Sequence, residues 1–430
     1  MADSSDSLLF LTKYVIQSLI FMWEDEKIEM DPSNVLEIEK LDDFEWNIRT
    51  ILKLTIRVDT RRKLWILKHK RELRCKFELD KIGIDHDQEY YVTDLEKCFN
   101  NEFSVYFSDD DEALDAQMLE EDMKKNEDES YQGMDDIEHE DYFESENLFD
   151  VYLFEPKLLA ASKRIFNHVM TKDILQNYIA RLLTETDHPK VLMSPCENTT
   201  VYKELLIPGI ESYKGLMYLD QYYGLYEVGA MIYYGLERLY ILNINGELTA
   251  KEEDEWPESV FLVTATDGSL PGQGMVRKEG EKVFYMNIPE DQIQTRKFAE
   301  GKNADLGSEA KIVVTDDITI NVEEADQGYI DQRNERVIMR RKDDNKYTET
   351  IIRTRMEEND CIQYITGENW DINAFTPNKT YQIIFDDPAK HEKYGKFKYR
   401  IAYAYHHITA ESMSHMRSVH RIILKKCPSK

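Results

Sequence analysis

The spacing of apolar residues separates strand-forming from helix-forming regions along the chain. Four short runs near the N-terminus are β-branched or aromatic and partly alternate between apolar and polar positions, at 35–41, 51–58, 74–80 and 102–108. Alternation with a period of two gives a strand one buried face. Residues 1–108 are therefore predicted to form a β-rich domain.

Helical spacing replaces this alternation in the middle of the chain. Pro156 suits a first helical turn, and apolar residues recur on one face through Val169. Thr171 can cap a second helix, whose buried stripe ends at Leu183. The pattern predicts a pair of packed helices over 156–185.

A tyrosine-rich stretch follows, LDQYYGLYEVGAMIYYGLERLYILN at 219–243. Three- and four-residue spacing predicts a helix over 212–226 with an aromatic face, ended by Gly229. Beyond this glycine, two apolar runs flank the polar turn GLER, which predicts a β-hairpin. Residues 149–245 are thus expected to hold a helix pair, a tyrosine-rich helix and a hairpin.

Five tyrosines of this unit are candidate interface residues: Tyr222, Tyr223, Tyr226, Tyr233 and Tyr240. A tyrosine ring offers a broad apolar face while its hydroxyl reaches water or a partner, so a tyrosine-dense surface suits a subunit boundary. Two alternatives stay open. Aromatic stripes at helical spacing are common in the core of a single chain, and clustered rings can also form a ligand cage.

The C-terminal half is expected to contain two β-rich units. Residues 246–345 are charged and rich in turns, and their short apolar runs predict an inserted β subdomain. Clear strands return in 346–430, the longest at 396–408. This strand is expected to pair with two others in an antiparallel sheet or barrel, at 380–385 and 419–424.

A cluster of histidines lies near the C-terminus: His406, His407, His415 and His420. Every second residue from Phe397 to His407 is predicted to share one face of its strand, so His406 and His407 point in opposite directions. Histidines on adjacent strands can bind zinc or iron, and at most three of these four could converge. Polar surface or interface positions are favoured, and no metal site is predicted.

Charge is distributed unevenly. The chain has a net charge of -30, which argues against general affinity for nucleic acid or anionic membranes. The block 109–146 contributes eighteen Asp or Glu against Lys124 and Lys125, a net of -16. Because such a block repels itself and has little to bury, residues 109–148 are predicted to be a flexible insertion. A docking strap for a basic partner is the alternative.

One stretch is strongly basic. Residues 57–76 contain nine Lys or Arg and one Trp, a pattern that can bind nucleic acid. In so acidic a chain, the stretch is expected to face an acidic surface instead, either the acidic block of the same chain or a neighbouring protein.

The sequence contains none of the common catalytic motifs. It lacks GxxxxGK[ST], HExxH, GxSxG and an EF-hand loop. A pair of carboxylates serving a glycoside hydrolase cannot be distinguished from chance pairs in an acidic chain. The chain is therefore predicted to be no enzyme and to need no cofactor, with an unrecognised hydrolase as the alternative.

Localisation follows from the cysteines and the N-terminus. The five cysteines show no CxxC pattern, which fits reduced thiols in a cytoplasm. The start MADSSDS lacks the basic region of a signal peptide, and the apolar stretch 8–23 is interrupted and too short to span a bilayer. Assembly in a cytoplasm without membrane contact is expected.

A resemblance adds what these patterns do not provide. The segment 187–243 carries the pattern YLD..YG.Y..G followed by a YLLN-like end, at Tyr218, Leu219, Asp220, Tyr223, Gly224, Tyr226, Gly229, Tyr240, Leu242 and Asn243. It resembles the middle of the central baseplate hub proteins of contractile bacteriophage tails, which are related to the N-terminal part of type VI secretion spikes. Tyr234 and Gly235 replace the Phe and Asp usual in that family.

The resemblance implies an α+β, mainly β fold of two tail-tube-like antiparallel β-barrels linked by an α/β portion. It also implies a homotrimeric ring that joins the hexameric tail tube to the central spike, in the virion baseplate, after assembly in the host cytoplasm. Expected partners are tail tube or distal tail proteins, the spike and baseplate wedge proteins, with no membrane and no specific nucleic acid. Alternatives are a wedge or distal tail protein, or an acidic module that binds basic proteins.

Overall fold

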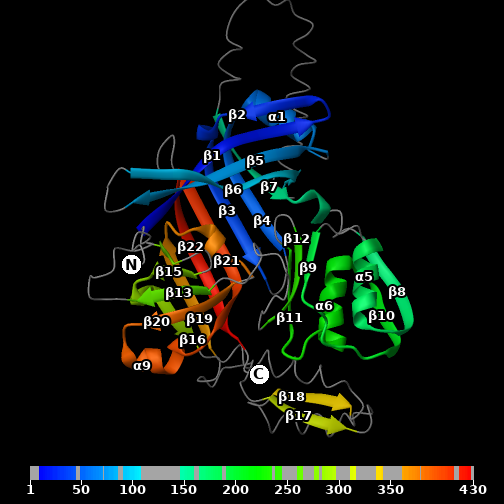
Figure 1. The fold of residues 1–430 in the computed structure, drawn as a ribbon. Coiled ribbons are helices and arrows are strands. Elements are labelled where there is room, and N and C mark those ends of the chain that lie inside the picture. Colours follow the sequence, from blue (N-terminus) through cyan, green and yellow to red (C-terminus); the bar gives the residue numbers. More distant parts are fainter. Residues whose placement is uncertain are drawn as a thin grey trace, which may run out of the picture.

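The structure is a computed structural model that describes most of the chain. The described residues are 9–44, 49–70, 72–85, 91–107, 146–158, 164–185, 190–234, 238–244, 259–264, 276–279, 283–296, 310–315, 336–341, 361–377, 379–410 and 416–427. Strands dominate these residues, and the longer helices are few (Figure 1). The predicted α+β, mainly β class is confirmed. Among the described helices, none is long and apolar enough to cross a membrane.

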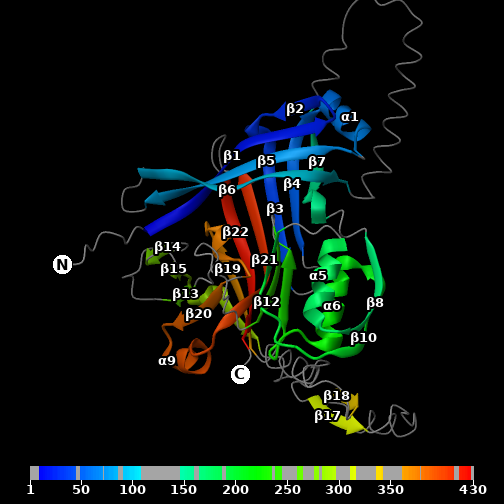
Figure 2. The same cartoon turned by 45° about the vertical axis from the view of Figure 1, so that its right-hand side comes forward.

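A first ring of antiparallel strands closes on itself in the order β1-β5-β6-β7-β4-β3-β21-β22. Its strands are β1 (Leu9–Trp23), β3 (Val35–Asp43), β4 (Arg49–Asp59), β5 (Arg74–Asp85), β6 (Tyr91–Tyr106), β7 (Glu146–Phe154), β21 (Tyr399–Ala410) and β22 (Met416–Lys426). The predicted strands at 35–41, 51–58 and 74–80 are parts of β3, β4 and β5. The first ring is completed by two strands from the opposite end of the chain: β21 pairs with β3, and β22 pairs with β21 and β1 (Figures 1 and 2).

Period-two alternation builds the core of this ring. In β4, Leu52, Leu54, Ile56 and Val58 are all buried, while the residues between them are more exposed. Two elements extend one end of the ring: strand β2 (Glu26–Met30), which pairs with β1, and helix α1 (Thr60–Lys68), which connects β4 to β5. Both lie at the top of the molecule in Figure 1.

A second ring shares β1, β21 and β22 with the first. It continues through β20 (Thr380–Phe385), β13 (Ser259–Thr264), β15 (Val283–Asn287) and β14 (Val276–Glu279), and β19 (Ile362–Glu368) and β16 (Ile293–Arg296) extend the sheet from β22. The barrels were expected to be antiparallel, but β13 pairs in parallel with both β15 and β20. Strands of the predicted units 1–108, 246–345 and 346–430 thus belong to one sheet.

The long C-terminal strand departs from its predicted alternation. The expected pairing of β21 with β20 and β22 is confirmed. A register shift between Ile401 and Tyr403, however, moves the following residues by one position. Because a shift of one residue exchanges the two faces of a strand, His406 is buried while Tyr405 is only partly buried. The prediction that Phe397 to His407 share one face is therefore wrong beyond the shift.

The α/β unit stands beside the rings (Figure 2). Strands β8 (Ile165–Asp173) and β10 (Tyr202–Glu211) form one sheet, which packs on α5 (Leu175–Glu185) and α6 (Ser212–Tyr223). Strands β9 (Lys190–Met193), β12 (Arg238–Asn243) and β11 (Ala230–Tyr234) form another. The remaining elements are β17 (Ala310–Thr315) paired with β18 (Arg336–Arg341), the short helices η1 (Pro32–Asn34), η3 (Glu290–Gln292), η4 (Ile372–Ala374) and α9 (Pro388–Lys390), and the π-helix η5 (His391–Gly395).

Two predictions in this unit need correction. The second helix of the predicted pair is present as α5. The first begins as predicted, with helical residues at 156–158, but its extension to Val169 is wrong, because residues 165–173 form strand β8. Phe166 is buried there between exposed neighbours, a period-two pattern that its pairing with β10 satisfies. The tyrosine-rich helix is present as α6, but it ends at Gly224, before the predicted Gly229.

Candidate functional site

The first two candidate tyrosines lie at the C-terminal end of helix α6. Tyr222 is 61% exposed, and its ring lies 4.2 Å from that of Tyr218. Tyr223 is partly buried and accepts a hydrogen bond from the backbone N–H of Leu206 on β10, at 3.4 Å. Gly224 ends the helix with a φ of 71°, a left-handed conformation that favours glycine. Of the five candidates, Tyr222 is the most exposed.

Tyr226 lies inside the chain. Its side chain is fully buried in the core of the α/β unit, and its hydroxyl donates to the backbone carbonyl of Ser194 at 2.7 Å. Burial raises the pKa of this hydroxyl above its usual value. Tyr226 therefore fixes the turn after α6 against strand β9, and its ring is not available to another subunit.

The predicted hairpin is confirmed as β11 and β12, and it places Tyr233 opposite Tyr240. Their rings are stacked with centroids 6.1 Å apart. Tyr240 is partly buried, whereas Tyr233 is 5% exposed and packs edge-on against Phe44, with ring centroids 4.3 Å apart. Tyr233 thus joins the α/β unit to the rings.

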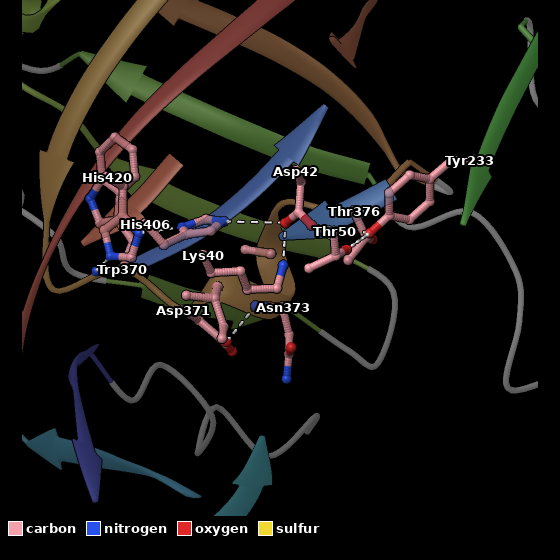
Figure 3. A network of polar contacts seen from close by, with 12 residues as sticks. Lys40, Asp42, Thr50, Tyr233, Trp370, Asp371, Asn373, Thr376, His406 and His420 are labelled. Carbon is pink, nitrogen blue, oxygen red and sulfur yellow. Dashed lines mark hydrogen bonds and ion pairs between the residues drawn. The ribbon is translucent and has the colours of Figure 1, made fainter. Parts of the chain in front are cut away.

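A buried polar network begins at the hydroxyl of Tyr233 (Figure 3). This hydroxyl lies 2.9 Å from Thr50 Oγ1 on β4 and donates to Asp42 Oδ1 on β3 at 3.2 Å. Thr50 also donates to Asp42 Oδ1, at 2.6 Å, and Lys40 forms an ion pair with the other carboxylate oxygen. Asp42 is 1% exposed, so a buried carboxylate is compensated by one cation and two hydroxyl groups.

The network continues into the histidine pair. The backbone N–H of Trp370 donates to His420 Nε2 at 3.2 Å, so this nitrogen accepts and the proton of neutral His420 is on Nδ1. His420 Nδ1 lies 2.6 Å from His406 Nδ1 and donates to it. The proton of His406 is then on Nε2, which faces Asp42 Oδ2 at 3.9 Å, too far for a hydrogen bond (Figure 3). The protons of the pair therefore point in one direction, from Trp370 toward Asp42.

Burial keeps both histidines neutral. It lowers the pKa of His420 to about 3 and the pKa of His406 well below its usual value, because a charged ring cannot be solvated in the core. His407, on the opposite face, is partly exposed and lies 3.5 Å from Glu37. His415 lies outside the described residues. Within the described part of the chain, no group of three His, Cys, Asp or Glu side chains could hold a metal ion.

A short loop closes the network on its far side. The indole of Trp370 stacks on His420, and only glycine fits at position 367, where a Cβ would lie 1.8 Å from the Trp370 ring. Tyr14 of β1 donates to the carbonyl of Trp370 at 2.7 Å and accepts from the N–H of Ile372 at 2.9 Å. Asp371 forms an ion pair with Lys81 of β5. The loop is thereby tied to two strands of the first ring.

This network connects elements that are far apart in the sequence. It joins β3, β4, β11, β21, β22 and the loop around Trp370, and its side chains hold one another in place. Sequence reasoning found the histidines and Tyr233 but missed Asp42, Thr50 and Trp370. Nothing in the sequence pairs residues as distant as Asp42 and Tyr233, and an Asp in an alternating strand is typical of its solvent face.

Three solved structures are similar to this chain over most of its length. The 43 kDa tail protein of prophage MuSo2 from Shewanella oneidensis has 10% identity and a TM-score of 0.47, covering 96% of this chain and 99% of that one. A tail protein from Neisseria meningitidis MC58 has 8% identity and a TM-score of 0.46, covering 96% of both chains. The E. coli c3393 protein, a type VI secretion component, has 8% identity and a TM-score of 0.39, covering 97% and 77%.

The family assignment rests on a sequence match. No curated protein matches the chain. The sequence model of the family described as Bacteriophage PBS1 gene 109 protein matches residues 10–427. Because this match spans nearly the whole chain, the protein belongs to the bacteriophage PBS1 gene 109 protein family.

Proposed function

We propose that the protein is a structural, non-enzymatic subunit of a contractile phage tail and forms the hub of its baseplate. Three copies assemble into a ring that connects the hexameric tail tube to the central spike. The observation that carries the proposal is the presence of two strand rings in one chain that share β1, β21 and β22. Three chains with two such rings each present six barrel-like units, which match a hexameric tube. Membership in a phage protein family supports this role.

The α/β unit offers a surface for the contact between subunits. Large apolar side chains are exposed on the outer face of its β8–β10 sheet and on α6: Ile165, Val169, Leu206 and Tyr222. Val169 and Leu206 are opposite each other in the register of the two strands, so these two exposed side chains lie side by side. Exposed apolar patches of this kind mark protein–protein contacts. Among the candidate tyrosines, the interface role is proposed for Tyr222.

The mass of the assembled particle tests this proposal. Mass photometry of the purified chain should show a species near 153 kDa, three times 50.9 kDa. The substitutions Val169→Glu and Leu206→Glu together should shift it toward the monomer without changing the circular dichroism spectrum. A control pair of charge changes in another part of the chain, Lys396→Glu and Lys398→Glu, should leave the trimer intact. A wild-type chain that stays monomeric at high concentration, with its tail partners present, contradicts the hub.

A further inference from the structure

Helix α1 concentrates positive charge on an acidic protein. The stretch 57–76 holds nine Lys or Arg against Asp59 and Glu72, whereas the whole chain has a net charge of -30. Four basic residues of the helix form what we call the α1 basic surface: Arg61, Arg62, Lys63 and Lys68. Arg61 and Lys68 are exposed and lie seven residues apart, so they share one face of the helix. Arg62 forms an ion pair with Asp59 at 3.3 Å, so the exposed Arg61 and Lys68 are the charges best suited to an anionic partner.

The local structure holds this face toward solvent. Asp59 caps the helix by accepting from the N–H of Arg62 at 2.8 Å, and Ile66 and Leu67 are buried against the first ring. The indole of Trp65 donates to Glu26 on β2 at 2.9 Å. With its apolar side and its N-terminus fixed, the helix presents Arg61 and Lys68 to solvent.

The acidic block of the same chain is attached beside this helix at both ends. Glu146 begins β7 opposite Asp59, the residue that caps α1. Asn147 donates from its side chain to Thr60 Oγ1 at 3.2 Å. On the other side of the block, Phe107 stacks on Phe149, with ring centroids 5.5 Å apart. The Phe149 ring also lies 5.5 Å from Lys63 Nζ. The chain therefore leaves and re-enters the described fold next to α1.

We infer that the α1 basic surface is the docking site of the chain's own acidic segment, residues 109–146. The segment has a net charge of -16, and no other stretch of the chain combines so high a charge with attachment at this site. A nine-residue helix is about 14 Å long, well within reach of a tether of this length. Tethering gives the segment an effective concentration of order 1 mM at the helix. Its contact excludes other polyanions, including nucleic acid, from the α1 basic surface.

Crosslinking of the intact protein provides the first test. A zero-length carbodiimide joins carboxylates to lysines that they touch, and the joined peptides are identified by mass spectrometry. Crosslinks from the segment 109–146 to Lys63 and Lys68 are expected, and they should decrease as salt rises, because exposed charges are screened within about 10 Å at 0.1 M. If the segment instead forms crosslinks mainly to Lys396 and Lys398, the inference is overturned.

Binding in trans provides the second test, with a variant in which 110–145 is replaced by a short Gly-Ser linker. A fluorescent peptide of residues 109–146 should bind this variant at least tenfold more tightly than it binds the full chain, where the site is already occupied in cis. The change Arg61→Glu with Lys68→Glu in the same variant should abolish binding, while Lys396→Glu with Lys398→Glu should not.

Three results of the second test would contradict the inference: no binding to the variant, equal binding to the variant and the full chain, or binding that survives the Arg61 and Lys68 changes. A short DNA duplex tests nucleic acid as the alternative occupant of the α1 basic surface. It should bind the linker variant more tightly than the full chain, and equal binding to both would mean that the acidic segment does not cover α1. If the linker variant fails to fold, the crosslinking result on the intact protein decides.

Discussion

The hydroxyl of Tyr233 should be essential to the junction between the α/β unit and the rings. The substitution Tyr233→Phe keeps the ring and its packing against Phe44, and removes only the oxygen that lies 2.9 Å from Thr50 Oγ1 and 3.2 Å from Asp42 Oδ1. A hydrogen bond to a charged group contributes about 1.5–3 kcal/mol. Since Thr50 and Lys40 still hold the carboxylate, we expect a loss of about 2 kcal/mol in the free energy of unfolding.

Urea denaturation followed by tryptophan fluorescence measures this loss as a lower midpoint. A double-mutant cycle with Thr50→Val isolates the coupling between the two hydroxyls, which should be about 1 kcal/mol. Tyr222→Phe is the matched control, because its ring is 61% exposed and its change should stay within about 0.5 kcal/mol. If Tyr233→Phe is as mild as this control, the hydroxyl does not belong to a buried network and the reasoning is refuted.

Four further predictions follow from the same structure. Folding lowers the pKa of His406 and of His420, so below a pH of about 6.5 the unfolded chain binds more protons than the folded chain. The free energy of unfolding should therefore fall by about 1.4 kcal/mol per pH unit for each histidine as the pH drops from about 6.5 toward 3. Urea midpoints at pH 7, 6 and 5 measure this slope, and His407→Gln should leave it unchanged. Tyr226→Ala should cost about 3–5 kcal/mol because it opens a cavity in a core, whereas Tyr222→Ala should leave the circular dichroism melting curve unchanged. Replacing 110–145 by a linker should leave the melting temperature within about 2 °C, since so charged a segment has little to bury; a larger loss would make the block structural. Elemental analysis should find no stoichiometric zinc or iron, and metal that disappears in a His406→Ala, His420→Ala variant would contradict this.

Local patterns predicted the elements that local physics determines. Strands β3, β4, β5 and β20 were found because their apolar residues alternate, and α5 and α6 because theirs recur at helical spacing. The strand β8 was missed for the same reason. Ile165, Phe166 and Val169 fit a helical period, whereas in the strand Phe166 faces the core and Ile165 and Val169 face outward. Only the pairing with β10 decides between the two.

The closure of the strand rings could not be predicted from these local patterns. That β21 and β22 complete the first ring depends on pairings such as Ile408 with Ile38, which no local rule specifies. The burial of His406 depends on a register shift of one residue at Ile401. The five candidate tyrosines were recognised as a group by composition, yet two of them are buried within the chain. Tyr226 is buried because the turn after α6 folds back on its own unit, and Tyr233 because the hairpin packs against the first ring.

The junction between the α/β unit and the two rings is polar, and this restricts how these three parts are oriented. An apolar contact between the α/β unit and the rings would stabilise many orientations almost equally, since apolar burial has no direction. The contact at Tyr233 is different, because the buried Asp42 gains the Tyr233 hydroxyl as a partner only when the α/β unit brings it to the oxygen that Thr50 already contacts. A rotated α/β unit would leave that carboxylate under-satisfied at a cost of about 1–3 kcal/mol or more. The histidine pair extends this requirement to β21, β22 and Trp370, so one orientation of the three units is favoured over its neighbours.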